Sequence, residues 1–261
     1  MTKLNPITTH VLRTWWIAPF VGVVVFAGLW EALVRIFDVR PFVLLAPSEI
    51  GTELMATPGF FIENAVVTGR HMVIGLVISL IVSIGIGAAM ASARFIEEAT
   101  QPVLVFILVT PWVAYVTSVV TWLNFGEAPI VFMVAFTSLP IFTFGVVGGM
   151  KSADQSAREL FASIDARRID VLFRLRLPAA LPSIFTTARF AVGLGLAAAY
   201  FSEGAALSNE GLGAAGKRAA AFNNGPTLWA TIVTTAALGL IGLGIIAAIE
   251  RAALRWHVSQ R

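Results

Sequence analysis

The sequence contains no cysteine and few charged residues, and both shortages narrow what the protein can be. Without cysteine, the 261-residue chain has no disulfide bond and no thiolate metal site. Its three histidines, His10, His71 and His257, are scattered and form no ligand cluster. Charged residues make up 13% of the chain against 57% hydrophobic ones, and the mean hydropathy is +0.85. This balance is unlike that of a soluble domain, and the net charge of +3 includes no dense basic stripe that would suggest nucleic acid.

Motifs for catalysis are also missing. No phosphate-binding loop of the G-x-x-x-x-G-K-[ST] type occurs, so the chain cannot hydrolyse ATP alone. No H-E-x-x-H or G-x-S-x-G motif and no paired carboxylates stand out in an apolar stretch, which gives an intramembrane enzyme little support. We therefore expect a non-catalytic membrane protein with no cofactor of its own.

Six apolar stretches are long enough to cross a bilayer. About 20 residues span the hydrocarbon core as a helix, which satisfies its own backbone hydrogen bonds there. The stretches cover residues 16–37, 66–91, 103–123, 130–149, 183–201 and 228–249. The first lacks a small-residue cleavage site and is long for a secretory signal, so we expect it to be retained. The predicted fold is an all-α membrane protein with about six transmembrane helices, forming a single domain over residues 1–261.

The positions of lysine and arginine predict the orientation, because positively charged loops stay in the cytoplasm. One alternation of the six spans collects twelve of these residues on one side, six of them between residues 151 and 176, and leaves three on the other. Both termini and the segment 151–182 are therefore expected in the cytoplasm. The intervals 38–65 and 203–226 are expected outside.

Small residues recur every four positions on the second predicted span, a pattern typical of closely packed membrane helices. They are Gly75, Ser79, Ser83, Gly87 and Ala91. A shorter row lies at positions 244, 248 and 252 of the last span. Both rows predict helix packing rather than ligand binding.

Four residues within or near the spans are candidates for lining a translocation path. Trp112, Tyr115 and Tyr200 could face a flat ligand, although aromatic residues at membrane depth more often pack or anchor at the interface. Glu203 lies about 30 Å along the fifth span from Pro182, at 1.5 Å per residue. It could either gate the path or anchor the loop that follows.

The interval 150–182 is the longest polar connection on the predicted cytoplasmic side. Before Asp165, apolar residues follow the helical spacing i, i+3, i+4 and i+7, and a second apolar stripe begins at Ile169. Asp165 could cap the N-terminus of the second helix. The pattern alone leaves two interpretations open: a docking surface for another protein, or an amphipathic hairpin resting on anionic membrane lipid.

This interval resembles the cytoplasmic signature of the inner-membrane permeases of binding-protein-dependent ABC importers. That signature reads E-A-A, three residues, G, nine residues, I-x-L-P. The spacing is kept throughout, and the signature positions are occupied by Glu159, Leu160 and Phe161, then Asp165, then Leu175, Leu177 and Pro178. Four of these seven residues differ from the signature: Leu160, Phe161, Asp165 and Leu175. The run LPAALP at 177–182 is similar to the nitrate, sulfonate and taurine branch, and the ELFASIDA form at 159–166 is closer to permeases for vitamin precursors. The resemblance extends from LLAPSEI at 44–50 to ERAALRW at 250–256.

The resemblance implies a role and a set of partners. Residues 159–178 would form coupling helices that sit in a groove of a separate ATPase subunit, which holds the ATP and magnesium. The complex would contain two ATPase subunits, a second permease copy in a homodimer and an extracytoplasmic substrate-binding protein, in the bacterial inner membrane. Because aspartate tolerates a positive φ better than most residues, we expect the bend at Asp165 to survive without the glycine of the signature. The expected substrate is a small organic molecule, ahead of an inorganic anion.

An ion- or proton-coupled secondary transporter is the alternative. Such proteins more often place ionisable residues near the bilayer midplane and repeat their topology internally. The sequence shows neither feature, so the importer permease is the preferred hypothesis.

Overall fold

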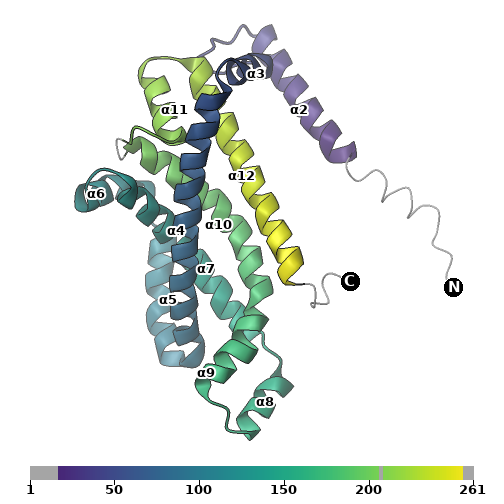
Figure 1. The fold of residues 1–261 in the computed structure, drawn as a ribbon, viewed down its shortest axis with the longest axis vertical. Helices are drawn as coiled ribbons and strands as arrows, with labels where there is room; N and C mark the ends of the chain where they lie inside the picture. Colours follow the sequence, from purple (N-terminus) through teal and green to yellow (C-terminus); the bar gives the residue numbers. More distant parts are fainter. Residues whose placement is uncertain (1–16, 206–207, 255–261) are drawn as a thin grey trace, which may run out of the picture.

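The computed structural model describes residues 17–205 and 208–254, and all regular structure in these residues is helical (Figure 1). The two predicted cytoplasmic termini and the end of the 250–256 motif lie outside the described residues. The helices are α2 (Ile17–Ile36), α3 (Pro47–Ala56), α4 (Pro58–Ser92), α5 (Arg94–Val109), α6 (Val113–Leu123), α7 (Glu127–Lys151), α8 (Gln155–Ser163), α9 (Arg168–Val171), a π-helical turn (Leu172–Arg176), α10 (Leu177–Ala205), α11 (Leu212–Ala221) and α12 (Gly225–Ala253).

Helix α7 is the centre of the bundle, and α4 and α10 pack along it (Figure 1). Its 25 residues measure about 37 Å at 1.5 Å per residue. Each end carries a charged pair: Glu127 pairs with Arg70 of α4, and Lys151 pairs with Glu97 of α5. A hydrocarbon core of about 30 Å fits between these two charged levels, so they mark the edges of the membrane.

Small side chains let α4 and α7 approach closely, as the four-residue spacing predicts. Gly75 lies against Val134 and Gly87 against Val146, and a Cβ atom at either glycine would be 2.5 Å from the valine side chain. The shorter row behaves differently. Gly244 has no neighbouring atom within 4 Å of a Cβ position, and residues 248 and 252 are exposed. The prediction that this second row packs within the bundle is therefore wrong.

The third predicted span, 103–123, is not one continuous helix. Helix α5 ends at Val109, α6 begins at Val113, and the two are bent by 101°. Pro111 has no backbone N–H to continue the helix, and its ring disfavours the helical conformation of Thr110, which has φ −73° and ψ 131°. The other five predicted spans coincide with α2, α4, α7, α10 and α12. Within the described residues, five helices are long and apolar enough to cross a membrane, or six spans if the bent pair counts as one.

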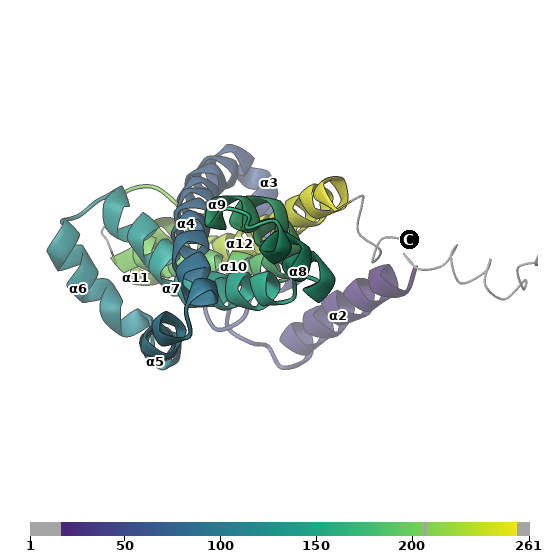
Figure 2. The same ribbon diagram turned by 90° about the horizontal axis from the view of Figure 1, so that it is seen from below.

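Helix α2 diverges from the bundle, and from below it projects on a different side from α6 (Figures 1 and 2). Of its residues only Val34 is buried. Glu31 ties the C-terminal part of α2 to α3, because its carboxylate accepts the Ser48 N–H at 3.0 Å; it also pairs with Arg35 within α2 at 2.6 Å. This charged pair therefore serves the fold.

Candidate functional site

The polar segment between α7 and α10 begins with α8, whose start is fixed by Asp154. The Asp154 carboxylate accepts hydrogen bonds from the Ser156 hydroxyl at 2.6 Å and from the Ala157 N–H at 3.0 Å, which makes it an N-cap. These bonds, that of Ser156 first, hold the pKa of Asp154 below its ordinary value. No residue of α8 is buried, so its own capping bond supports the helix more than the core does.

Asp165 ends α8 instead of starting the next helix. Its φ is 47°, its N–H donates to the Ala162 carbonyl at 3.1 Å, and the Ala166 N–H donates to the Phe161 carbonyl at 3.0 Å. This pair of bonds is the Schellman motif, in which a residue with positive φ closes a helix. The predicted N-cap role of Asp165 is therefore wrong, since α9 begins at Arg168 without a side-chain cap. The expected left-handed bend at Asp165 is confirmed.

The second helix of the segment runs into the fifth span without a break. Helix α9 passes through the π-helical turn 172–176 into α10, and the Leu177 N–H closes this turn on the Leu172 carbonyl. Pro178 follows the π-helical turn inside this continuous helix, and it has no N–H to donate to the preceding turn. Leu175, Leu177 and Pro178 are half-buried, and Leu172 and Leu177 pack against a cluster of α7 and α10. A displacement of α9 is therefore carried directly into a membrane-spanning helix.

Large apolar side chains of this segment are left uncovered. Four of them are more than half exposed: Leu160, Ile164, Ile169 and Phe173. Phe161 is half-buried, and Glu159 is exposed and accepts a hydrogen bond from Gln155 at 3.0 Å. An apolar surface of this kind, rimmed by polar residues, is typical of a protein or membrane contact.

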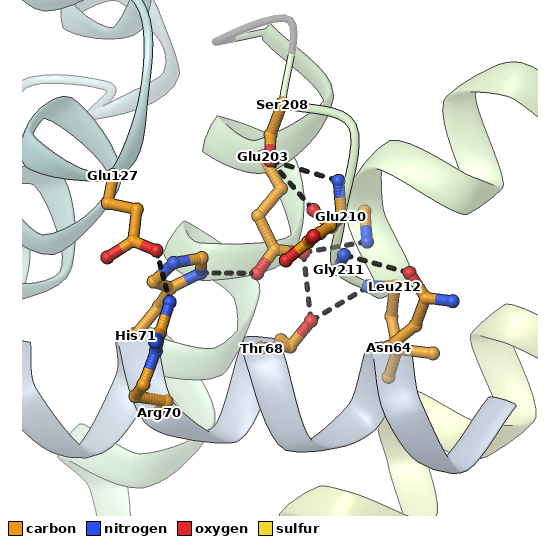
Figure 3. A network of polar contacts seen from close by, with 11 residues as sticks. Asn64, Thr68, Arg70, His71, Glu127, Glu203, Ser208, Glu210, Gly211 and Leu212 are labelled. Carbon is orange, nitrogen blue, oxygen red and sulfur yellow. Dashed lines mark hydrogen bonds and ion pairs between the residues drawn. The ribbon is translucent and has the colours of Figure 1, made fainter. Parts of the chain in front are cut away.

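A second polar site lies at the opposite end of the bundle, around the carboxylate of Glu203 in α10 (Figure 3). Glu203 is 0% exposed. Its Oε1 lies 2.9 Å from Nδ1 of His71, and its Oε2 accepts the Thr68 hydroxyl and the Gly213 N–H, both at 2.9 Å. His71 is buried as well, and its Nε2 has no hydrogen-bond partner. Both oxygens of the buried carboxylate are thus satisfied, as burial of such a group requires.

The same side chains fasten the start of α11. The backbone N–H groups of residues 211, 212 and 213 donate to Asn64 at 2.8 Å, to Thr68 at 2.8 Å and to Glu203 at 2.9 Å. The first N–H groups of a helix have no internal partner and form the positive end of its dipole, so a carboxylate is favourable there. Of the two roles expected for Glu203, this geometry favours the anchor of the segment that follows α10.

The sequence reasoning missed the partners of Glu203 on α4. Asn64, Thr68 and His71 follow the spacing i, i+4 and i+7, which places three polar groups on one helix face at the edge of an apolar run. That spacing was the available signal. Across residues 17–205 and 208–254, no three His, Cys, Asp or Glu side chains come together as metal ligands.

The three aromatic candidates for the path lie in packing contacts. Trp112 meets the ring of Phe201 edge-on at 5.7 Å, and Tyr115 meets Phe136 in the same way at 5.6 Å. The Tyr200 hydroxyl lies 3.3 Å from the hydroxyl of Thr231. All three are half-buried, and Trp112 stands at the break between α5 and α6.

Comparison with known proteins gives a consistent result. Residues 81–255, about two thirds of the chain, match the family described as the inner membrane component of binding-protein-dependent transport systems. The chain is 29% identical to the formylaminopyrimidine transport permease protein of Halalkalibacterium halodurans, over 89% of this chain and 92% of that protein. It is 24% identical to the taurine transport system permease protein of Escherichia coli, over 88% and 86%. It is 23% identical to a putative aliphatic sulfonates transport permease protein of the same organism, over 97% and 95%.

Proposed function

Because this chain belongs to the family of inner membrane components of binding-protein-dependent transport systems, we propose that it carries a small, flat organic solute into the cell. As a member of that family it is a multi-pass membrane protein and the permease subunit of an ABC importer. It forms the translocation path and couples to a separate ATPase, and it is not itself the catalytic subunit.

The proposed substrate class rests on the relatives. Their names specify formylaminopyrimidine, taurine and, putatively, aliphatic sulfonates, all of them organic. The pyrimidine permease matches over nearly the full length of both chains. A nitrogen heterocycle is therefore the preferred substrate, ahead of an inorganic anion.

The proposed coupling surface is the segment 159–178. Its support is the apolar surface of Leu160, Ile164 and Ile169, which nothing in the described chain covers, together with the continuity of α9 with α10. In this proposal α8 and the turn at Asp165 sit in a groove of the ATPase subunit, which holds the ATP and magnesium. Nucleotide-driven closure of the ATPase subunits would then move α10 directly.

The proposed assembly contains two copies of this chain, two ATPase subunits and an extracytoplasmic binding protein. The excess of lysine and arginine on one side supports cytoplasmic termini and a cytoplasmic segment 151–182. In that orientation the charged pair of Lys151 marks the cytoplasmic edge of the membrane. The Glu203 site lies at the outer edge, where a binding protein would dock.

The coupling proposal is tested by copurification of the ATPase subunit. Replacing Leu160 and Ile164 together by aspartate should remove the ATPase while membrane insertion stays normal. Burying two such side chains contributes about 3 to 6 kcal/mol, which charged replacements would forfeit. The matched control is Phe222→Asp, an 83% exposed apolar residue at the other end of the bundle. If the double variant retains its ATPase and transports at the parent rate, the hairpin resting on lipid is the better interpretation.

The substrate proposal is tested by uptake into cells. Deleting the gene for this chain should abolish saturable uptake of a labelled aminopyrimidine, and taurine should not compete with that uptake in the parent strain. Uptake of nitrate that depends on this chain and is insensitive to aminopyrimidines would contradict the proposal.

A further inference from the structure

The break between α5 and α6 lies at membrane depth. Glu97, near the start of α5, shares a charged pair with Lys151 at one edge of the membrane. Thr110 follows thirteen residues later, which is about 20 Å along a helix at 1.5 Å per residue. The two charged levels on α7 are about 37 Å apart. The chain therefore leaves its helical path inside the hydrocarbon region, beyond its midpoint.

Backbone polar groups are left without partners at this break. Among the described residues, no hydrogen bond reaches the carbonyl oxygens of residues 107–110, and the N–H groups of residues 112 and 113 donate to none. The bonds that close the first turn of α6 run from Ala114 to Pro111 at 2.9 Å and from Tyr115 to Trp112 at 3.0 Å. Pro111 supplies no N–H for the carbonyl of residue 107.

The rest of the chain covers these groups only in part. Of the residues that carry them, Leu108, Val109 and Val113 are exposed, and Ile107, Thr110 and Trp112 are half-buried. In hydrocarbon each unsatisfied backbone group costs several kcal/mol, so non-helical backbone at this depth is tolerated only against protein or along a water-filled cavity. Lipid is therefore excluded as the neighbour of this break.

We infer that the break at Thr110–Trp112 lines the aqueous translocation path and contacts the solute through main-chain oxygens. This inference rests on the proposed import of an organic solute and adds the feature that selects it. Four free acceptor oxygens stand against two free N–H donors, so the break favours a solute rich in N–H donors over an anion. The Trp112 ring, held edge-on by Phe201, offers a flat face at the same place. An amino-substituted nitrogen heterocycle combines both properties.

Cysteine accessibility tests the inference directly, because the chain has no cysteine to remove first. We would place Val109→Cys and Thr110→Cys separately in the full chain, in membrane vesicles of both orientations that hold the complete transporter. The probe is a membrane-impermeant, positively charged methanethiosulfonate. The control is Val24→Cys, an exposed position in the middle of α2. Thr110 bonds the Phe106 carbonyl through its hydroxyl at 2.8 Å, so Val109→Cys remains informative if Thr110→Cys fails to fold.

The expected result is labelling at the break roughly tenfold faster than at residue 24, because the reactive thiolate requires water. 4-Amino-2-methylpyrimidine should slow this labelling and taurine should not. Absence of labelling from both sides in correctly inserted variants would overturn the inference. Oxidative cross-linking of Val109→Cys between two copies would then identify a second permease as the cover. Protection by taurine instead of the pyrimidine would overturn the donor preference. If aminopyrimidine uptake persists while the break stays unlabelled, the proposed function survives and this inference alone fails.

Discussion

Replacing Glu203 by alanine should loosen the end of the bundle that lies opposite α8. The buried carboxylate takes part in three polar contacts, and hydrogen bonds to charged groups contribute about 1.5 to 3 kcal/mol each. Truncation also leaves His71 and the Gly213 N–H buried without partners, and each unsatisfied buried group costs about 1 to 3 kcal/mol. We expect a loss of about 4 kcal/mol in the free energy of unfolding, or roughly 10 °C in the melting temperature. Thermal unfolding of the full chain in nanodiscs measures it.

The control for this experiment is Glu63→Ala, which removes the same charge from an exposed position on α4. It should change stability by about 0.5 kcal/mol or less. Hydrogen exchange gives the second readout, because amides of α11 should exchange faster in Glu203→Ala and not in Glu63→Ala. If Glu203→Ala is as stable as the control and the amides of α11 exchange at the same rate in both variants, but Glu203→Ala abolishes transport, then Glu203 gates the path and the anchor assignment is wrong.

Three further predictions concern the helix ends and the topology. Gly213→Ala should destabilise the chain more than Gly85→Ala in the same unfolding assay, because its Cβ would lie 1.7 Å from an α10 carbonyl oxygen whereas Gly85 has open space; equal effects would argue against the close approach. Because the folded pKa of Asp154 is lowered, its capping of α8 should persist above the ordinary pKa of 3.8 and be lost as pH falls through the lowered value. Pepsin should therefore cut α8 of the parent chain more readily at a pH below the lowered pKa of Asp154 than at a pH above the ordinary value. In Asp154→Ala the susceptibility of α8 to cutting should be the same at both pH values. Ser156→Cys should react with impermeant reagents only from the cytoplasmic side and Phe222→Cys only from outside; the reverse pattern would invert the topology.

The spans show how far local signals reach. Length and apolar composition predicted α2, α4, α7, α10 and α12, because crossing a membrane depends on these two properties alone. Length and apolar composition wrongly predicted one continuous helix at 103–123. Pro111 breaks the helix because it lacks a backbone N–H, and it leaves the apolar character of the stretch unchanged. The pair Thr110–Pro111 was readable in the sequence, and the 101° bend was not.

The polar sites depend on contacts that no local pattern contains. The positive φ of Asp165 followed from its place in the signature, but whether it ends one helix or starts the next is decided by which carbonyls its neighbours reach. The sequence singled out Glu203 by its distance along the fifth span and left open whether it gates the path or anchors the loop that follows. Its partner Thr68 lies 135 residues away, so the anchor appears only when α4, α10 and α11 assemble.

The division of one span into α5 and α6 also bears on how the protein enters the membrane. Membrane segments leave the ribosome in chain order, and a segment partitions into lipid on its own when it offers about 20 apolar residues. Helix α5 has 16 residues and α6 has 11, and the proline between them prevents them from forming one continuous helix. Neither helix is therefore long enough to insert into the membrane alone. Helix α5 packs on α4 and α7, and α6 packs on α7 and α10, so both halves of the hinged pair depend on helices that are synthesised after them. We therefore expect the hinged pair to settle in the membrane late, after α7 and α10 have been made.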